Sequence, residues 1–590
     1  MNCQIFSIRI LANHLLTLII LLTSSLLSAQ DLSKTQTDWE FSEVTIDGIN
    51  GISLNLYKGK GTHVRVPKSI DGKNIIALCY KKGGSAGLFG QKNTSPNTRV
   101  RSFEAHDNGI LVIGSSTFNN CNNISFSVQL PNSVKVIERY AFVGSKISSF
   151  TFPSSLTTLG DHAFAYCEEL SWVSSIPDSV DEIKSETFFE CKNLHVNFSD
   201  LVSPHIKKVG SRAFSGCGNL VGKFHLTEVT HIGYFAFEEC SGLSGNLVLP
   251  NTLIELEYSA FNKCSGLNGT LTLPVNITKI STGLFSGCTN LNGDVTIPSR
   301  VTAIGNSAFL NCSGLNGTLT LPMNLKSIGD AAFRNTNFTG ELQIPNNLSD
   351  IGRFTFYDCK NFQPGSLMPE NIYTIPEECF RNSSAYRQNL IIPDKIDFID
   401  YFAFNGDPAD GAREIKSITL PENFYEISER SFIGTTKQLK RITISAEMPP
   451  IVKMWVDKRF NILRRKTPDE IIVFDDEAYD NATLFVPKGF VDVYRAAPLW
   501  SRFTKIKEII PTAVDLSLIT KPYQVITSRH GIRIIDTSKI KEIRFYDIQG
   551  RLIHIDNGNS TFVTTKSYQN QMVVVKIVCK DKTIYTEKLI

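Results

Sequence analysis

Residues 269–292, GTLTLPVNITKISTGLFSGCTNLN, contain the pattern that decides the fold. In TLTLP the polar and apolar side chains alternate, which predicts a short strand with both leucines facing a core. The proline ends that strand because it has no amide hydrogen to donate. Cys288 follows Phe285 by three residues, so both side chains are expected on one face of a helical or 3-10 turn.

The same pattern returns along the chain with a period near 24 residues, which predicts a repeat solenoid whose units bury their apolar faces against one another. One phenylalanine per unit is expected to form a buried spine. The spine positions are Phe118, Phe142, Phe164, Phe188, Phe214, Phe237, Phe261, Phe285, Phe309, Phe333, Phe356, Phe380, Phe404 and Phe432.

This pattern resembles the BspA-type leucine-rich repeat, whose consensus is roughly LxIPxxVxxIGxxAFxxCxxL. Residues 295–315, VTIPSRVTAIGNSAFLNCSGL, match it. The resemblance covers about residues 60–450, and 482–509 is similar to the segment that closes such arrays. It implies a parallel β-sheet with short helical or 3-10 turns, an exported protein at the cell surface, and adhesion to other molecules.

The first 29 residues read as a signal peptide, with Arg9 ahead of the apolar run 15–22 and a cleavage site after Ala29. The alternative is a membrane anchor, but eight apolar residues fall well short of the about 20 that a span needs. We therefore expect a mature chain without a transmembrane span, secreted or held at the outer cell surface.

The remaining chain divides by its pattern. We expect an N-terminal segment over 30–60, the solenoid over 61–440, an end segment or cap over 441–510, and a small all-β domain over 511–590. The last part is similar to the sorting domain of the type IX secretion system through its strand Gly-Ile-Arg-Ile at 531–534 and FYDIQGRL at 545–552. The rival interpretation is a small β domain that only completes the fold.

Charge and motifs exclude several functions. Lys and Arg number 60 and Asp and Glu 57, so the basic excess of a nucleic-acid-binding protein is missing. The basic run 458–466 is expected to be a solvated loop or cap surface, with a polyanion contact as the alternative. The sequence lacks the short motifs of zinc hydrolases, serine hydrolases and phosphate-binding loops. We expect a protein that is not an enzyme and uses no cofactor.

Nine cysteines occupy one equivalent position of the repeat, three residues after the spine phenylalanine. Equivalent side chains point the same way, so they predict buried free thiols rather than a disulfide framework or a metal site. His225 and His231, six residues apart, are expected to face solvent. The nine are Cys121, Cys167, Cys191, Cys217, Cys240, Cys264, Cys288, Cys312 and Cys359.

The outward positions of the predicted strands are the candidate binding face, because they are free of packing constraints. They are small and polar, which favours weak, distributed binding to an extracellular protein or a glycan. The alternatives are a surface protein that binds glycans for nutrient capture, marked by exposed tyrosines or tryptophans in a row, and an enzyme scaffolded by the repeats. The central candidates are Thr270, Thr272, Asp294, Thr296, Thr318, Thr320, Glu341 and Gln343.

Overall fold

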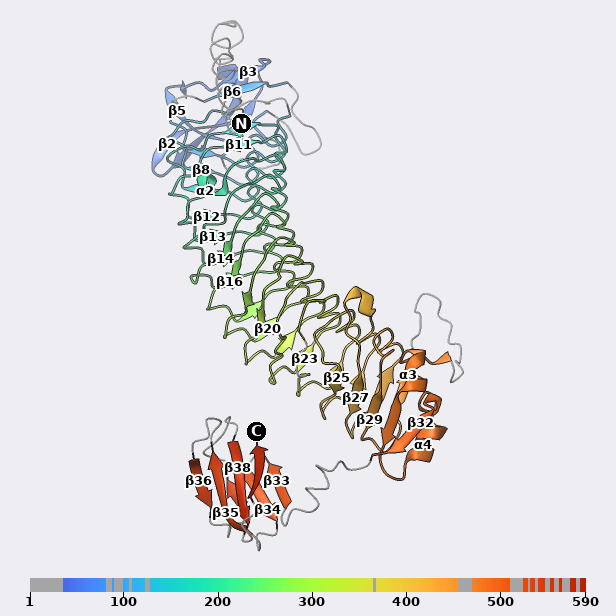
Figure 1. Ribbon diagram of the computed structural model, residues 1–590. Helices are drawn as coiled ribbons and strands as arrows, with labels where there is room; N and C mark the ends of the chain where they lie inside the picture. The colour runs from blue at the N-terminus through green and yellow to red at the C-terminus, as the bar shows by residue number, and fades with distance from the viewer. Residues whose placement is uncertain are drawn as a thin grey trace, which may run out of the picture. The chain divides into compact units, whose positions relative to one another are not determined.

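The computed structural model describes residues 36–80, 87–89, 99–105, 109–122, 128–363, 368–454 and 470–509, together with strands between 524 and 589. Contacts divide the chain into two compact units, Met1–Lys507 and Glu508–Ile590. In the first unit, short coils stack one on the next as the sequence pattern predicts (Figure 1). Among the described residues, no helix is long and apolar enough to cross a membrane.

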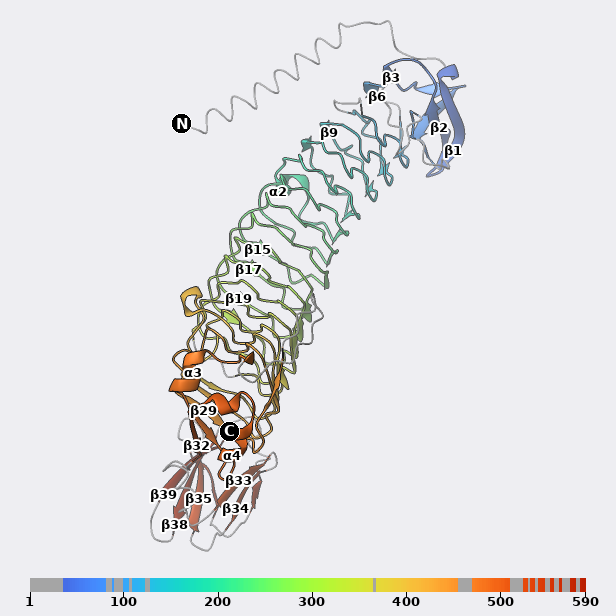
Figure 2. The same ribbon diagram turned by 90° about the vertical axis from the view of Figure 1, so that its right-hand side faces the viewer.

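Strands that lie just before the repeat prolines form the Leu-Pro ladder, whose strands β15, β17 and β19 follow one another in Figure 2. Its pairings are parallel within the array, for example Val295 with Leu319 and Thr296 with Thr320. The strands are β3 (His63–Arg65), β6 (Ser102–Glu104), β9 (Ser149–Phe150), β11 (Trp172–Val173), β15 (Leu247–Val248), β17 (Leu271–Thr272), β19 (Val295–Thr296), β21 (Leu319–Thr320), β25 (Asn389–Ile391), β27 (Ser417–Leu420), β29 (Arg441–Ile444), β31 (Thr483–Val486) and β32 (Lys505–Glu508).

A second row of parallel strands, the Ile ladder, contains isoleucines that follow the repeat prolines, and the sequence pattern did not predict it. Its first strand, β2, pairs antiparallel with β1 (Trp39–Ile46), and β4 (Ser69–Ile70) pairs antiparallel with β5. The strands are β2 (Ile49–Tyr57), β5 (Lys73–Leu78), β7 (Val112–Ile113), β8 (Val136–Ile137), β10 (Thr158–Leu159), β12 (Glu182–Ile183), β13 (Lys208–Val209), β14 (His231–Ile232), β16 (Glu255–Leu256), β18 (Lys279–Ile280), β20 (Ala303–Ile304), β22 (Ser327–Ile328), β23 (Asp350–Ile351), β24 (Thr374–Ile375), β26 (Phe398–Ile399), β28 (Glu426–Ser428) and β30 (Ile451–Lys453).

The segment around each spine phenylalanine, the Phe turn, is not the predicted helical or 3-10 turn. In the repeat of Phe261, Ser259 and Lys263 have φ angles of 54° and 58°, in the left-handed region. This conformation aims the amides of Ser259, Phe261 and Lys263 at carbonyls of the next repeat, at 2.9, 3.0 and 2.6 Å. Each Phe turn thus bonds to the next repeat as well as within itself, where the Cys264 amide donates to the Phe261 carbonyl at 3.3 Å. Helices occur elsewhere: η1 (Gln36–Asp38), α2 (Phe198–Leu201), η2 (Pro408–Asp410), α3 (Asp476–Asn481), α4 (Val491–Ala496) and η4 (Trp500–Arg502).

The predicted phenylalanine spine is confirmed. Phe237, Phe261, Phe285, Phe309, Phe333 and Phe356 are fully buried, with successive ring centroids 5.3–6.1 Å apart. The stack continues beyond Phe432 to Phe474, whose rings are 5.5 Å apart. Residues after 440 therefore extend the same core, and they also continue the Leu-Pro ladder through β29 and β31.

Close stacking of the repeats explains the glycine of the Ile-Gly pair. A Cβ atom at Gly305 would lie 2.6 Å from the backbone nitrogen of Thr282 in the preceding repeat. A contact under 3.0 Å is not accommodated without moving the backbone. Glycine is therefore required at this position by the approach of two chains rather than by its own φ angle.

The array ends at a buried carboxylate. Asp475, 8% exposed, accepts hydrogen bonds from the amides of Gly434 and Thr436 and from the Thr436 hydroxyl, at 2.8–3.0 Å. For the Gly434 amide, the carboxylate replaces the carbonyl that a further repeat would supply, as Ile433 does for Gly406. Beyond it, Trp500 is fully buried and donates to the carbonyl of Pro450.

In the second unit, the residues that the structure describes form seven strands in two antiparallel sheets, ordered β33-β34-β37 and β36-β35-β38-β39. The expected small all-β domain is thus present. Its strands are β33 (Gln524–Ser528), β34 (Gly531–Ile535), β35 (Ile540–Tyr546), β36 (Leu552–Asp556), β37 (Phe562–Thr564), β38 (Val573–Cys579) and β39 (Ile584–Leu589).

Candidate functional site

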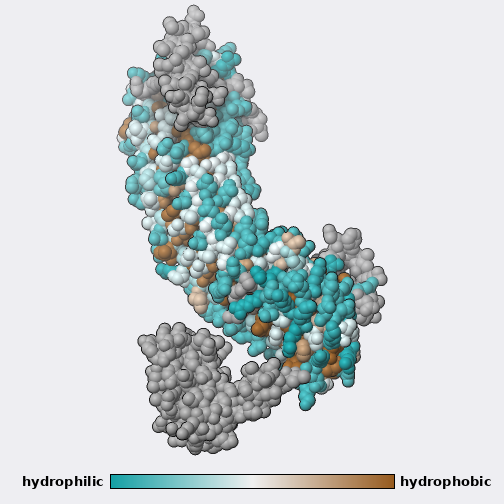
Figure 3. Space-filling view, in the orientation of Figure 1, coloured by the Kyte–Doolittle hydropathy of each residue, from teal (hydrophilic) through white to brown (hydrophobic). Residues whose placement is uncertain are grey.

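All eight candidate side chains point outward from four consecutive repeats. In β17, Leu271 is 6% exposed while Thr272 on the same strand faces solvent, as the alternating pattern requires. The viewed face of the array is largely hydrophilic, with separate hydrophobic spots (Figure 3). The exposed residues are Thr270, Thr272, Asp294, Thr296, Thr318, Thr320, Glu341 and Gln343. We call them the candidate row.

Some members of the candidate row contact one another across repeats. The Thr318 amide and hydroxyl both donate to the Asp294 carboxylate, at 2.6 and 2.9 Å. These hydrogen bonds lower the pKa of Asp294 because they stabilise its charged form. Gln343 donates to Glu341 at 3.1 Å. Asp294 therefore connects two repeats, and the row carries two carboxylates and no cation.

A second group of exposed side chains was missed by sequence reasoning. Tyr234 and Tyr258 are 37% and 44% exposed, and their rings stack at 5.1 Å. The Arg212 guanidinium lies 5.4 Å from the Phe235 ring and 6.0 Å from the Phe189 ring. This aromatic edge follows the Phe turns. Its sequence signal is the recurrence of aromatic residues two or three positions before the spine phenylalanine.

The described cysteines are free and buried, as predicted, and two further ones, Cys79 and Cys379, join them. Burial raises the pKa of the Cys167 and Cys359 thiols to about 12. Eight of these thiols donate to the carbonyl of the preceding spine phenylalanine, for example Cys312 to Phe285 at 3.0 Å. The repeated cysteine is thus a small buried hydrogen-bond donor.

Within the described ranges, no group of three or more His, Cys, Asp or Glu side chains could hold a metal ion. The expectation that His225 and His231 face solvent is wrong, because both are half-buried. A ring nitrogen of His225 lies 2.8 Å from the carbonyl oxygen of Val202, so the histidine packs against its neighbouring repeat. The predicted signal peptide 1–29 and the basic run 458–466 lie outside the described residues.

Comparison with known proteins agrees with this architecture. The family described as the BspA type leucine-rich repeat region matches residues 93–221, 174–292, 207–338, 292–409 and 410–485, which together span more than half of the chain. The chain belongs to this family. A comparison with curated proteins gave no match.

Several solved structures are similar. A leucine-rich repeat protein from Bacteroides ovatus is 19% identical over 80% of this chain and 98% of its own, with a TM-score of 0.44. A leucine-rich cell surface protein from Faecalibacterium prausnitzii is 19% identical over 73% and 97%, with a TM-score of 0.34. The pneumococcal vaccine antigen PcpA is 15% identical over 81% and 98%, with a TM-score of 0.31.

Proposed function

We propose that this protein is an exported, non-enzymatic binding protein of the cell surface, which adheres to extracellular proteins or glycans along its solenoid. The observation that carries the proposal is the candidate row. Its side chains are exposed at equivalent positions of successive repeats, while their neighbours on the same strands are buried. Side chains on such a surface can be replaced without disturbing the core. Many weak contacts along it together raise the affinity for a large partner.

The alternative of nutrient capture requires aromatic platforms for sugar rings. The aromatic edge offers one tyrosine pair, but Tyr234 and Tyr258 stack on each other with planes 3° apart. Each ring thereby covers one face of the other, which leaves less ring surface for a sugar. This observation favours adhesion through the candidate row over glycan capture on aromatic platforms.

The test uses two matched pairs of threonines on adjacent repeats. Thr296 and Thr320 are register partners in the Leu-Pro ladder, whereas Thr302 donates its amide to the Thr278 carbonyl beside the Ile ladder. Binding of the mature chain is screened against extracellular-matrix proteins and a glycan array. We expect T296R/T320R to weaken the binding found by about tenfold, and T278R/T302R to leave it unchanged. Equal binding by both variants, or no binding by the parent chain, would overturn the proposal.

We further propose that residues 508–590 direct the chain through type IX secretion. The support is the sequence resemblance of 531–552, together with a strand-rich unit separate from the array by its contacts. The test fuses 508–590 to a periplasmic reporter in a bacterium that has this secretion system, with a secretion-deficient strain as control. Reporter on the cell surface only in the competent strain is expected; periplasmic reporter in both strains would leave the domain a structural one.

A further inference from the structure

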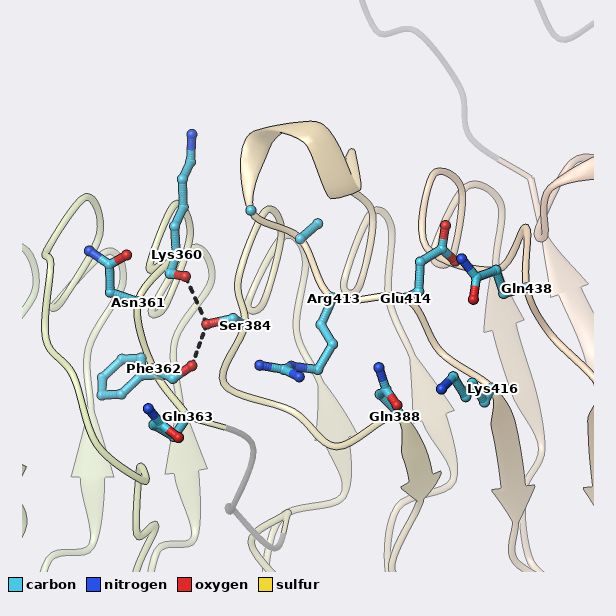
Figure 4. A pocket seen from close by; sticks show the side chains of 12 residues that line it. Lys360, Asn361, Phe362, Gln363, Ser384, Gln388, Arg413, Glu414, Lys416 and Gln438 are labelled. Atoms are coloured by element: carbon cyan, nitrogen blue, oxygen red, sulfur yellow. Dashed lines mark hydrogen bonds between the residues drawn. The ribbon is translucent and has the colours of Figure 1, made fainter.

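A polar cleft of about 600 Å³ follows the candidate row along the array, beside the 28-residue repeat between Phe404 and Phe432 (Figure 4). The side chains that matter for its chemistry are Lys360, Gln363, Gln388, Arg413, Lys416 and Gln438. They come from successive repeats. In Figure 4 the Arg413 side chain lies between Gln363 and Gln388.

Two features of the repeats border this cleft. The Leu-Pro ladder pairs Glu341 with Gln363. Close to Gln363, the Ser384 hydroxyl donates to the carbonyls of Lys360 and Phe362, at 2.9 and 2.6 Å.

The second feature is the 28-residue spacing between Phe404 and Phe432, four more than the usual period. The extra residues form η2, which Asp407 caps by accepting from the Ala409 amide at 2.9 Å. Gly411 then turns the chain with a φ of 96°, so close to Lys360 that a Cβ atom would lie 2.9 Å from that side chain. Insertions in repeat proteins often form the binding face.

The cleft wall combines cationic side chains with glutamine amides that can hydrogen-bond to hydroxyl groups. Lys360, Arg413 and Lys416 carry positive charge, and Lys360 is partly offset by Asp358 at 3.7 Å. Among the described residues, Arg413 Nε and Glu414 Oε2 are buried without a hydrogen-bond partner. The Arg413 backbone is held by the Tyr386 hydroxyl, which donates to its carbonyl at 2.9 Å. A buried guanidinium nitrogen without a partner points to an anionic ligand.

We propose that this cleft binds an acidic saccharide unit, a sugar carboxylate such as a uronic acid. The ligand carboxylate would meet Arg413 and Lys416, and its hydroxyls would meet the amides of the cleft glutamines. An acidic peptide would satisfy the cations but would bring few hydroxyls for these amides. Phe362 is 2% exposed, so it offers little apolar contact for a peptide side chain. This site goes beyond the adhesion proposed for the candidate row.

The experiment titrates the mature full-length chain with glucuronate, glucose and a short Asp-rich peptide by calorimetry. We expect glucuronate to bind more tightly than the other two, and R413Q to weaken it about tenfold through loss of a charge-assisted contact. K416M tests the exposed cation with little risk to folding. K440M is the matched control, because Lys440 follows Lys416 on the next repeat and is not among the residues that form the cleft.

Absence of glucuronate binding would overturn the proposal, as would equal affinity for glucose or tighter binding of the peptide. Unchanged affinity in both R413Q and K416M would also overturn it. The urea midpoint of each variant is measured alongside, so that an unfolded protein is not taken for lost binding. T296R/T320R is expected to bind glucuronate normally, which separates this cleft from the candidate row.

Discussion

The Cys264 thiol donates a hydrogen bond to the carbonyl oxygen of Phe237, 2.9 Å away in the preceding repeat. That carbonyl also accepts from the Cys240 amide at 3.1 Å, so the thiol occupies its second acceptor site. The contact recurs along the array. It joins successive Phe turns inside the core, where water cannot replace it.

We expect Cys264→Ala to destabilise the array by about 1–2 kcal/mol, because it removes the donor and leaves a small void. Cys264→Ser should cost less, since Thr435 at the equivalent position donates through a hydroxyl to Phe404 at 3.0 Å. The urea-unfolding free energies of both variants check this. Equal losses for serine and alanine would mean that the hydrogen bond contributes nothing.

The buried thiols predict a pH dependence. Burial raises their pKa above the 9.0 of an exposed thiol, to about 12 for Cys167 and Cys359. The stabilisation is therefore complete below about pH 9 and is lost as the pH rises toward 12, because the folded chain binds more protons than the unfolded one. Each such thiol contributes up to about 1.4 kcal/mol per pH unit in this window.

The measurement compares urea midpoints at pH 8 and 10 for the parent chain and for C167S/C191S/C217S/C240S. We expect the urea midpoint to fall less between pH 8 and pH 10 in the variant than in the parent chain. Identical falls would refute the view that the buried thiols cause the pH dependence. In a C3S/C579S background the remaining eleven thiols should resist a thiol reagent at pH 8 until the chain unfolds.

The phenylalanine spine predicts that a smaller side chain at a spine position lowers the free energy of unfolding, and that the loss grows with the volume removed. Phe285 stacks on Phe261 and Phe309 with centroids 6.1 and 5.4 Å away and is fully buried. We expect Phe285→Ala to cost about 3–5 kcal/mol and Phe285→Leu clearly less. Thr272→Ala, on the exposed side of β17, is the control and should stay within about 0.5 kcal/mol. A Phe285→Ala loss no larger than that of the control would contradict the stacked core.

The Asp475 carboxylate ends the array, so its removal is expected to loosen the last Phe turn locally. Asp475→Ala leaves the Gly434 and Thr436 amides without acceptors in a buried site, which should cost about 2–4 kcal/mol. Asp475→Asn keeps one acceptor oxygen and should lose less. Hydrogen exchange of residues 430–436, with 258–264 as internal reference, checks this. Equal protection of 430–436 in all three proteins would show that Asp475 is not a cap.

The solenoid could be predicted from the amino-acid sequence, because the phenylalanine, cysteine and proline positions recur with a period near 24 residues, which is typical of stacked units. It likewise determined which side chains of β17, β19 and β21 face outward, since strand alternation is a local property. The exposure of Thr272 and Thr296 follows from that rule.

Features that depend on contacts between neighbouring repeats could not be predicted from the sequence of one repeat. The Ile ladder cannot be predicted from the sequence of one repeat, because each two-residue strand forms only by pairing with strands of adjacent repeats. The left-handed turns at Ser259 and Lys263 are held by carbonyls of the next repeat, which local propensity does not reveal. The polar cleft lies beside a longer repeat, where the stacking of repeats brings Gln363 and Arg413 to one cleft from 50 residues apart.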